Sequence, residues 1–366
     1  MFPSLQSLSR VFPPPHFLVA PAAGLAISAH ALRFASFDGS GERHLRLANY
    51  GEAEIPDGVF AGGEIKDRGA LKAILSDFQK KHGLRSVYVS VPEQPSFILY
   101  LALPPLQRSE IRGNLLGRIE QHVPFSANDI VFDYEIAECA ETENDSALCV
   151  GVTILPQKIA ADYLLLLAEC GVEPLSLELG AHALSRALLP PKNKGAYMLV
   201  DIDAAETGIA IVHDDIVRFT ATITIGGNML SDVLAKQLSI PPEEAVRVKR
   251  LVGLKKTKDG LDVADILIPP LSTLRDEIKR YFLYWHTHTV SAEAAVLPRI
   301  QKIILCGEEA DIPGLADYLR GSLKESVGIA NPWRNINSLS AYTPRLSRVH
   351  SLRYATAFGL ALRAFY

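Results

Sequence analysis

The apolar residues in the second half of the chain form three short runs followed by a helical pattern. The runs at 198–202, 207–212 and 216–225 predict three strands, and Asp201 and Asp203 stand at the end of the first. Gly226 and Gly227 then interrupt the pattern, and apolar residues at 230, 233, 234 and 238 have the spacing of one helix face. The predicted order is therefore strand, hairpin, Gly-Gly corner and helix.

The first half of the chain begins with the same strand–turn–strand plan. Residues 25–37 and 43–48 predict a hairpin around the turn at 38–41, and 87–91 predict a short buried strand. Between them an amphipathic helix is predicted over 68–81, and Gly83 supplies its end. Apolar spacing predicts further strands and helices, namely strands at 148–155 and 300–305 and helices at 157–170, 180–189, 242–250, 269–288, 313–323 and 352–365.

Residues 95–146 predict a small inserted α+β subdomain. It contains a strand at 96–102, a helix at 108–122 and a strand at 129–138. The Pro-rich segment 190–195 is the clearest boundary between the two halves. The chain is accordingly divided into four predicted parts: a flexible N-terminal arm (1–20), a first lobe (21–94 and 147–190, with the C-terminal helix 350–366), the insert (95–146) and a second lobe (195–349). The fold class is α/β.

Composition narrows the classes of function. The chain has 366 residues, 48% hydrophobic and 21% charged, which is typical of a soluble globular protein. A net charge of −4 without a long basic run gives no case for nucleic-acid binding. No apolar run reaches the roughly 18 residues of a membrane span, so we expect no direct membrane insertion. Because no metal-ligand string, P-loop or hydrolase elbow occurs, we predict no metal site and no catalytic residue.

Six short segments carry a resemblance to a known family. They are VYVSVP (87–92), IEQHVPF (119–125), LVDI (199–202), IGGN (225–228), IPGLA (312–316) and ANP (330–332). In this order, within residues 24–365, they resemble the PilM family of type IV pilus assembly proteins, relatives of FtsA and of actin. The resemblance implies an actin-like fold, a duplicated ribonuclease H-like core whose two lobes enclose a nucleotide cleft. It also implies a cytoplasmic protein, peripheral at the inner membrane, that binds the N-terminal cytoplasmic peptide of the membrane protein PilN.

The resemblance places the nucleotide phosphates at Gly-rich turns, and there this chain departs from the family. The departures remove a metal anchor and glycines and add carboxylates: Ala26 for Asp, Ser28 for Gly, Asp203 for Gly, Glu206 for Thr, and Glu308 and Glu309 for two glycines. Carboxylates within about 4–6 Å of a triphosphate are strongly repulsive. We therefore expect no ATP hydrolysis, and as cofactor either none or weakly bound ATP or ADP with Mg.

Other positions of the implied nucleotide site are retained. These candidate cofactor-binding residues are Asp201, Thr207, Gly226, Gly227, Asn228, Lys249 and Gly307. The Gly pair either opens a helix whose N-terminus meets a phosphate or only makes a tight corner. Glu244, Arg247 and Lys249 lie on the helix that contacts the nucleoside in relatives, or else form a solvated helix face. Both alternatives stay open for the Gly pair and for the charged residues.

The insert is the better candidate for partner binding. Its strand at 97–101 is apolar on both faces, and its helix carries an apolar stripe. A unit of this size cannot bury all of that surface alone. Part of it can pack on the main core, and the remainder can form a groove for an extended peptide. We predict Leu99, Leu101, Arg112 and Leu116 as groove residues.

The leading hypothesis is a catalytically degenerate scaffold, not an enzyme, that binds a PilN-like peptide, with other pilus platform proteins and self-association as further possible contacts. The alternative is an ATP-binding switch of the same fold, whose nucleotide state controls partner binding. A carbohydrate or acetate kinase-like enzyme is disfavoured because no catalytic Asp can be named. A fourth reading is the cytoplasmic part of a type II secretion platform protein of related fold. Three results separate the first three hypotheses. A scaffold binds its partner whether or not ATP is present, and a switch binds it in a nucleotide-dependent way. A kinase transfers a phosphoryl group.

Overall fold

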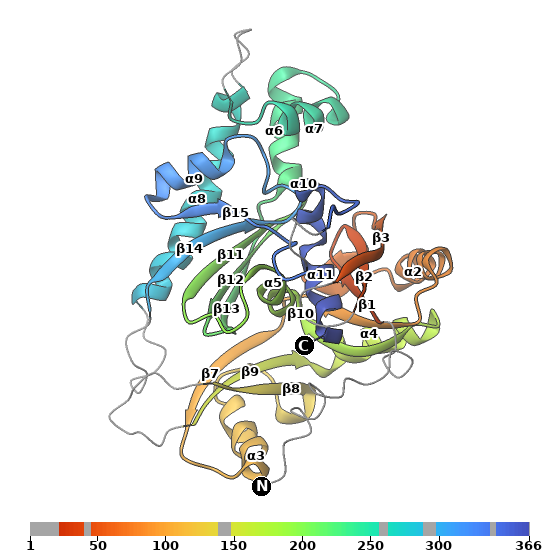
Figure 1. Ribbon diagram of the computed structural model, residues 1–366, viewed down its shortest axis with the longest axis vertical. Coiled ribbons are helices and arrows are strands. Elements are labelled where there is room, and N and C mark those ends of the chain that lie inside the picture. The colour runs from red at the N-terminus through yellow and green to blue at the C-terminus, as the bar shows by residue number, and fades with distance from the viewer. Residues whose placement is uncertain are drawn as a thin grey trace.

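The first lobe is built on a five-stranded mixed sheet between two helical layers (Figure 1). The computed structural model describes residues 22–39, 45–137, 148–255, 263–287, 298–336 and 342–365; the predicted arm at 1–20 lies outside them. In sheet order the strands are β10 (Glu173–Leu179), β6 (Ser86–Val91), β1 (Ala22–Ile27), β2 (Ala31–Asp38) and β3 (Arg46–Glu54). Successive side chains of β1 point to opposite faces of the sheet. Leu25 and Ile27 pack in the core under α2 and α4, and Gly24 faces α11 on the other side.

The helices of the first lobe follow its apolar spacing. They are α2 (Arg68–His82), α4 (Gln157–Glu169) and α5 (Gly180–Leu188), and a two-stranded hairpin, β4 (Phe60–Ala61) with β5 (Glu64–Ile65), precedes α2. In α2, Leu71, Leu75 and Phe78 are buried on one face. Asp67 caps its first turn by accepting from the Ala70 amide at 2.9 Å, and Gly83 ends it at φ 65°. The helix and the end predicted from the sequence are confirmed.

The second lobe has a five-stranded sheet of its own. In sheet order its strands are β13 (Ile216–Ile223), β12 (Thr207–His213), β11 (Ala196–Ile202), β14 (Ile300–Cys306) and β15 (Val327–Ile329). Its helices are α6 (Gly227–Leu238), α7 (Pro242–Leu251), α8 (Val263–Thr287) and α9 (Leu315–Leu323). Although α8 has 25 residues, neither it nor another helix of the described ranges is long and apolar enough to cross a membrane.

The two sheets have the same topology. In each lobe the first strand pairs antiparallel with the second and the second with the third, while parallel strands extend the sheet on the other side. The order β10-β6-β1-β2-β3 therefore matches β15-β14-β11-β12-β13. This repeat of topology confirms the predicted duplicated, two-lobed α/β fold.

The insert is a three-stranded antiparallel sheet covered by one helix. It comprises β7 (Phe97–Leu103), α3 (Arg108–Ile119), the 3-10 turn Ala127–Asp129, β8 (Ile130–Ala137) and β9 (Leu148–Pro156). Because β9 is the middle strand, paired with both β7 and β8, assigning it to the first lobe was wrong. A central strand is apolar on both faces, and its sequence pattern is therefore the same as that of a strand in a main sheet.

The C-terminal segment joins the first lobe. After α10 (Arg348–Ser351) and the 3-10 turn Leu352–Tyr354, α11 (Ala355–Leu362) packs on α5, β1 and β2 (Figure 1). Two glycines allow this approach. A Cβ on Gly24 would lie 2.1 Å from the Ala357 carbonyl oxygen, and one on Gly359 would lie 1.8 Å from the Ala183 carbonyl oxygen. The backbones of α11, α5 and β1 thus touch where a side chain would separate them.

Gly359→Ala should lower the free energy of unfolding by about 1–3 kcal/mol, because the added methyl group must push α11 away from the α5 backbone. Urea denaturation of the whole chain measures this. The matched control is Gly321→Ala in α9, where a Cβ meets no atom within 4 Å; there Ala should stabilise the helix by up to about 1 kcal/mol. Equal effects of the two substitutions would contradict the close approach of α11 and α5.

Candidate functional site

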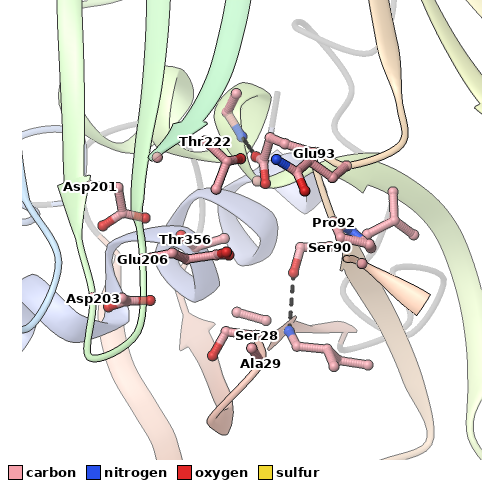
Figure 2. Close-up of a pocket in the computed structure, with 18 of the residues that line it drawn as sticks. Ser28, Ala29, Ser90, Pro92, Glu93, Asp201, Asp203, Glu206, Thr222 and Thr356 are labelled. Atoms are coloured by element: carbon pink, nitrogen blue, oxygen red, sulfur yellow. Dashed lines mark hydrogen bonds between the residues drawn. The ribbon is translucent and has the colours of Figure 1, made fainter. Parts of the chain in front are cut away.

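The two lobes face each other across a cleft of about 310 Å³. The first lobe lines it with the β1–β2 turn, the segment after β6 and the start of α5, and the second lobe with the β11–β12 turn. Figure 2 shows Asp201, Asp203 and Glu206 on one side of the cleft and Ser28 and Glu93 on the other. This is the place where an actin-like fold would hold a nucleotide.

The first turn uses its polar groups internally. The Ser28 amide donates to the Ala31 carbonyl at 3.0 Å, and the Ala31 amide donates to Ser28 Oγ at 3.2 Å. The Ile27 amide donates to Ser90 Oγ at 3.1 Å (Figure 2). Gly24, which resembles the family's first turn glycine, serves the contact with α11 instead. These amides are therefore taken by protein acceptors.

The cleft is lined by four carboxylates, together with Arg33, Arg353 and several uncharged polar residues. Burial and the neighbouring carboxylates of Asp203 and Glu93 raise the pKa of Asp201. Burial also raises the pKa of Glu93, whose Oε1 accepts from the Ala181 amide at the start of α5 at 2.9 Å, and the pKa of Glu206. Burial is the largest cause of each raised pKa, and the charges of neighbouring carboxylates add to it. Among the residues that the structure describes, no group of three or more His, Cys, Asp or Glu is placed to hold a metal ion.

A buried guanidinium joins the lobes across the cleft. Arg33 on β2 donates through Nε to Glu52 at 2.7 Å and through Nη2 to Glu308 at 2.8 Å. Its Nη1 lies 3.6 Å from Asp203, and Arg353 approaches Glu52 at 3.1 Å. Burial lowers the pKa of Arg33, but the three carboxylates together raise it above its ordinary value. Two of the acids that depart from the family are thus partners of a cation of the chain itself.

The N-terminus of α6 is closed by the neighbouring turn. The amides of Gly227 and Asn228 donate to the carbonyls of Asp203 and Ala204 at 3.0 and 2.7 Å. A Cβ on Gly226 would lie 2.6 Å from the Asp203 carbonyl oxygen, so the Gly pair makes a tight corner. These amides, which a phosphate would need at a helix start, are occupied.

The space beside this corner is filled by a buried ion pair. Lys249 Nζ lies 2.8 Å from Glu309 Oε2 and donates to the Gly227 carbonyl at 2.8 Å. Both side chains are at most 3% exposed. Burial lowers the pKa of Lys249, and Glu309 opposes that shift. A Cβ on Gly227 would lie 2.3 Å from the Glu309 carboxyl carbon, so the carboxylate rests directly on the corner.

The other predicted residues have structural places. Thr207 is fully buried and donates to the Ile225 carbonyl at 2.6 Å. Gly307 has φ 88° and turns the chain after β14. Glu244 and Arg247 are exposed on α7, 3.8 Å apart, as the solvated-face interpretation predicts. Lys249 fits neither sequence alternative, because it is buried and points to Glu309.

The structure therefore gathers most of the predicted cofactor-binding residues at one corner, where the amides of Gly227 and Asn228 are bonded to protein carbonyls and Glu309 packs against Gly227. Of the candidates, only Asp201 lines the cleft. Sequence reasoning missed Arg33 and Glu93. A charged residue inside an apolar strand pattern, as Arg33 is at 31–37, was the available signal.

A second hollow lies where the insert meets both lobes. It has a volume of about 240 Å³ and is lined by consecutive residues of β8 (131–135) and β10 (177–179), by parts of β9 and α5, and by Ile216 and Val217 of the second lobe. Among the described strands, β8 and β10 are each the last strand of their sheet. The hollow, called the groove below, is thus lined by the edge strands of two sheets.

The predicted groove residues lie elsewhere. Leu99 and Leu101 lie on the face of the insert's sheet that α3 covers, and they pack in the core of the insert. Arg112 stacks over the Phe132 ring at 4.4 Å, and Leu116 is 37% exposed on α3. None of the four lines the groove between β8 and β10, so their part in partner binding stays a prediction.

The class of protein follows from the duplicated lobes and the cleft between them: the fold is that of the actin-like ATPases. EutJ, an ethanolamine utilization protein of Carboxydothermus hydrogenoformans, is similar with a TM-score of 0.55 and 16% identity, over 97% of this chain and 91% of that chain. MreB5 of Spiroplasma citri bound to ADP gives 0.53 and 13%, over 93% and 94%. At these identities the likeness shows the fold.

The particular family is shown by the sequence. The profile described as type IV pilus assembly protein PilM matches residues 24–365, and this chain belongs to that family. A structure of a PilM-PilN type IV pilus biogenesis complex is similar with a TM-score of 0.76 and 20% identity, over 95% of this chain and 99% of that chain. The resemblance seen in the six short segments is confirmed.

Lys249→Met should lower the free energy of unfolding by about 3–5 kcal/mol, because it leaves the Glu309 carboxylate buried without its cation. Urea denaturation measures the loss. Adding Glu309→Gln to Lys249→Met should recover most of it, since the unpaired charge is gone. Lys236→Met, on an exposed position of α6, is the control and should change stability by less than about 0.5 kcal/mol. An unchanged urea midpoint for Lys249→Met would contradict the buried pair.

Asp201→Asn should stabilise the protein more at neutral than at acid pH. The folded-state pKa of Asp201 is raised, so ionising it costs free energy above that pKa, and the cost disappears as pH falls toward the unfolded value of about 3.9. The measurement is the difference in unfolding free energy between variant and wild type at about pH 8 and about pH 5. Asp77→Asn on the exposed face of α2 is the control, and an equal difference at both pH values would overturn the prediction.

Proposed function

We propose that this chain is a partner-binding scaffold of a type IV pilus assembly platform. It holds the N-terminal cytoplasmic peptide of a PilN-like inner-membrane protein in the groove between β8 and β10. The observation that carries the proposal is that β8 and β10, each at the edge of its sheet, both line this groove. An extended peptide can add to such an edge through its backbone while alternate side chains enter the groove.

The proposed partner follows from the family and from the neighbour described as a PilM-PilN complex. A protein that binds the cytoplasmic end of a membrane protein works in the cytoplasm and lies at the inner membrane through its partner. The depth of the groove supports peptide capture, because Val91, Leu155 and Leu179 form a buried apolar floor. Apolar side chains of the peptide would leave water there.

The proposal includes a cleft that neither hydrolyses ATP nor binds it tightly. Three features support it: the carboxylates that line the cleft, the Arg33 contacts across the lobes, and the Lys249–Glu309 pair at the α6 corner. At the nucleotide position that the family resemblance implies, each of these groups would compete with a phosphate, its metal or the nucleoside. The alternative, an ATP-binding switch, requires these pairs to open.

Titration calorimetry with a synthetic PilN-like N-terminal peptide tests the proposal. Val131→Arg, on the groove side of β8, should weaken binding at least about tenfold, since a cation would replace an apolar wall residue. Leu116→Arg, on the opposite face of the insert, is the matched control and should bind as wild type does. Mg-ATP at millimolar concentration should produce no heat and leave the peptide affinity unchanged.

Other results would count against specific parts of the proposal. Loss of binding in Leu116→Arg alone would move the partner site to the α3 face predicted from the sequence. A peptide affinity that changes with Mg-ATP would favour the nucleotide switch. Undetectable peptide binding by the wild-type chain would overturn the scaffold role.

A further inference from the structure

The wall that β8 gives to the groove carries two carboxylates. Asp133 and Glu135 line the groove, stand two residues apart on one face of the strand, and are exposed. Asp133 Oδ1 accepts from the neighbouring Tyr134 amide at 2.9 Å. Within the described residues, neither carboxylate has a cationic side chain within ion-pair distance. The wall therefore presents negative charge to whatever enters.

The cations at the groove are directed elsewhere. Arg186 donates to both carboxylate oxygens of Glu178, at 2.7 and 3.0 Å, and Arg363 also pairs with Glu178. Glu178 is 8% exposed, so this cluster is mostly removed from water. Since both guanidiniums are bound to that carboxylate, they do not neutralise the β8 wall.

A second polar feature lies at the inner side of the groove. His182 Nδ1 is buried and has no hydrogen-bond partner among the described residues, while Nε2 lies 3.4 Å from Thr153 Oγ1. Both residues line the groove. An unsatisfied buried ring nitrogen is costly, and a polar group of an occupant would relieve it.

We infer that the groove selects an extended peptide in which a lysine or arginine alternates with apolar side chains. The inference rests on the proposed function and adds the chemistry of the partner. Side chains of an extended chain alternate between two sides, so apolar residues can face the floor while a cation lies against Asp133 and Glu135. Opposite charges on adjacent strands attract and like charges repel, so the same wall disfavours an acidic peptide.

A displayed library of random ten-residue linear peptides, selected against the full chain, tests the inference. Wild type should enrich Lys and Arg next to apolar residues, with Lys→Glu versions of the selected peptides binding roughly two- to twenty-fold more weakly. Asp133→Asn with Glu135→Gln should lose the preference for Lys and Arg but keep the apolar one. The control, Glu54→Gln with Asp77→Asn, removes the same charge from exposed positions of the first lobe and should select as wild type does.

The outcomes separate the two proposals. Peptides that bind wild type, lose binding in Val131→Arg, and show no preference for Lys or Arg would overturn the inference and leave the groove as the partner site. Selected peptides that bind Val131→Arg as well as wild type would overturn the groove itself. An equal preference for Lys and Arg in the double variant and in wild type would assign the charge selectivity to another surface and also overturn the inference.

Discussion

The buried guanidinium of Arg33 joins the two lobes by ion pairs, beside the apolar contacts that α5 makes with the second lobe. It lies in the first lobe, and two of its three carboxylate partners, Asp203 and Glu308, come from the second. A buried charge is tolerated only while it is paired, so pulling the lobes apart would take Asp203 and Glu308 away from Arg33, which would keep only Glu52. The charges that join the two lobes across the cleft therefore all belong to the protein itself.

The same principle explains why the added acids are tolerated in this chain. From the sequence, Asp203, Glu308 and Glu309 were interpreted only as repulsive to a triphosphate. In the structure Asp203 and Glu308 lie beside Arg33, and Glu309 lies beside Lys249. Each added carboxylate thus has a cation of the protein as its partner. The carboxylates at these turns therefore add contacts between elements that are distant in the sequence.

The sequence predicted what depends on local pattern and missed what depends on long-range pairing. The α2 helix with its Gly83 end, the β11–β12–β13 meander and the Gly226–Gly227 corner follow from spacing and turn chemistry. The place of β9 does not, since its apolar pattern suits either the insert or a main sheet. Arg33 was visible as a charge within an apolar strand, but its partner Glu308 is 275 positions away, and one sequence does not show such a pair.

The insert makes contacts that bring the groove close to both lobes. β13 of the second lobe contributes Ile216 to the groove, and a Cβ on Gly151 of β9 would lie 2.9 Å from Ile216 Cγ2. Arg218 of the same strand lies over the Tyr100 ring at 3.4 Å. The groove thus has walls from both lobes and the insert, and its width depends on how the lobes are held. For the proposed peptide binding, walls that are already held by contacts within the protein would lower the free energy spent on ordering the protein.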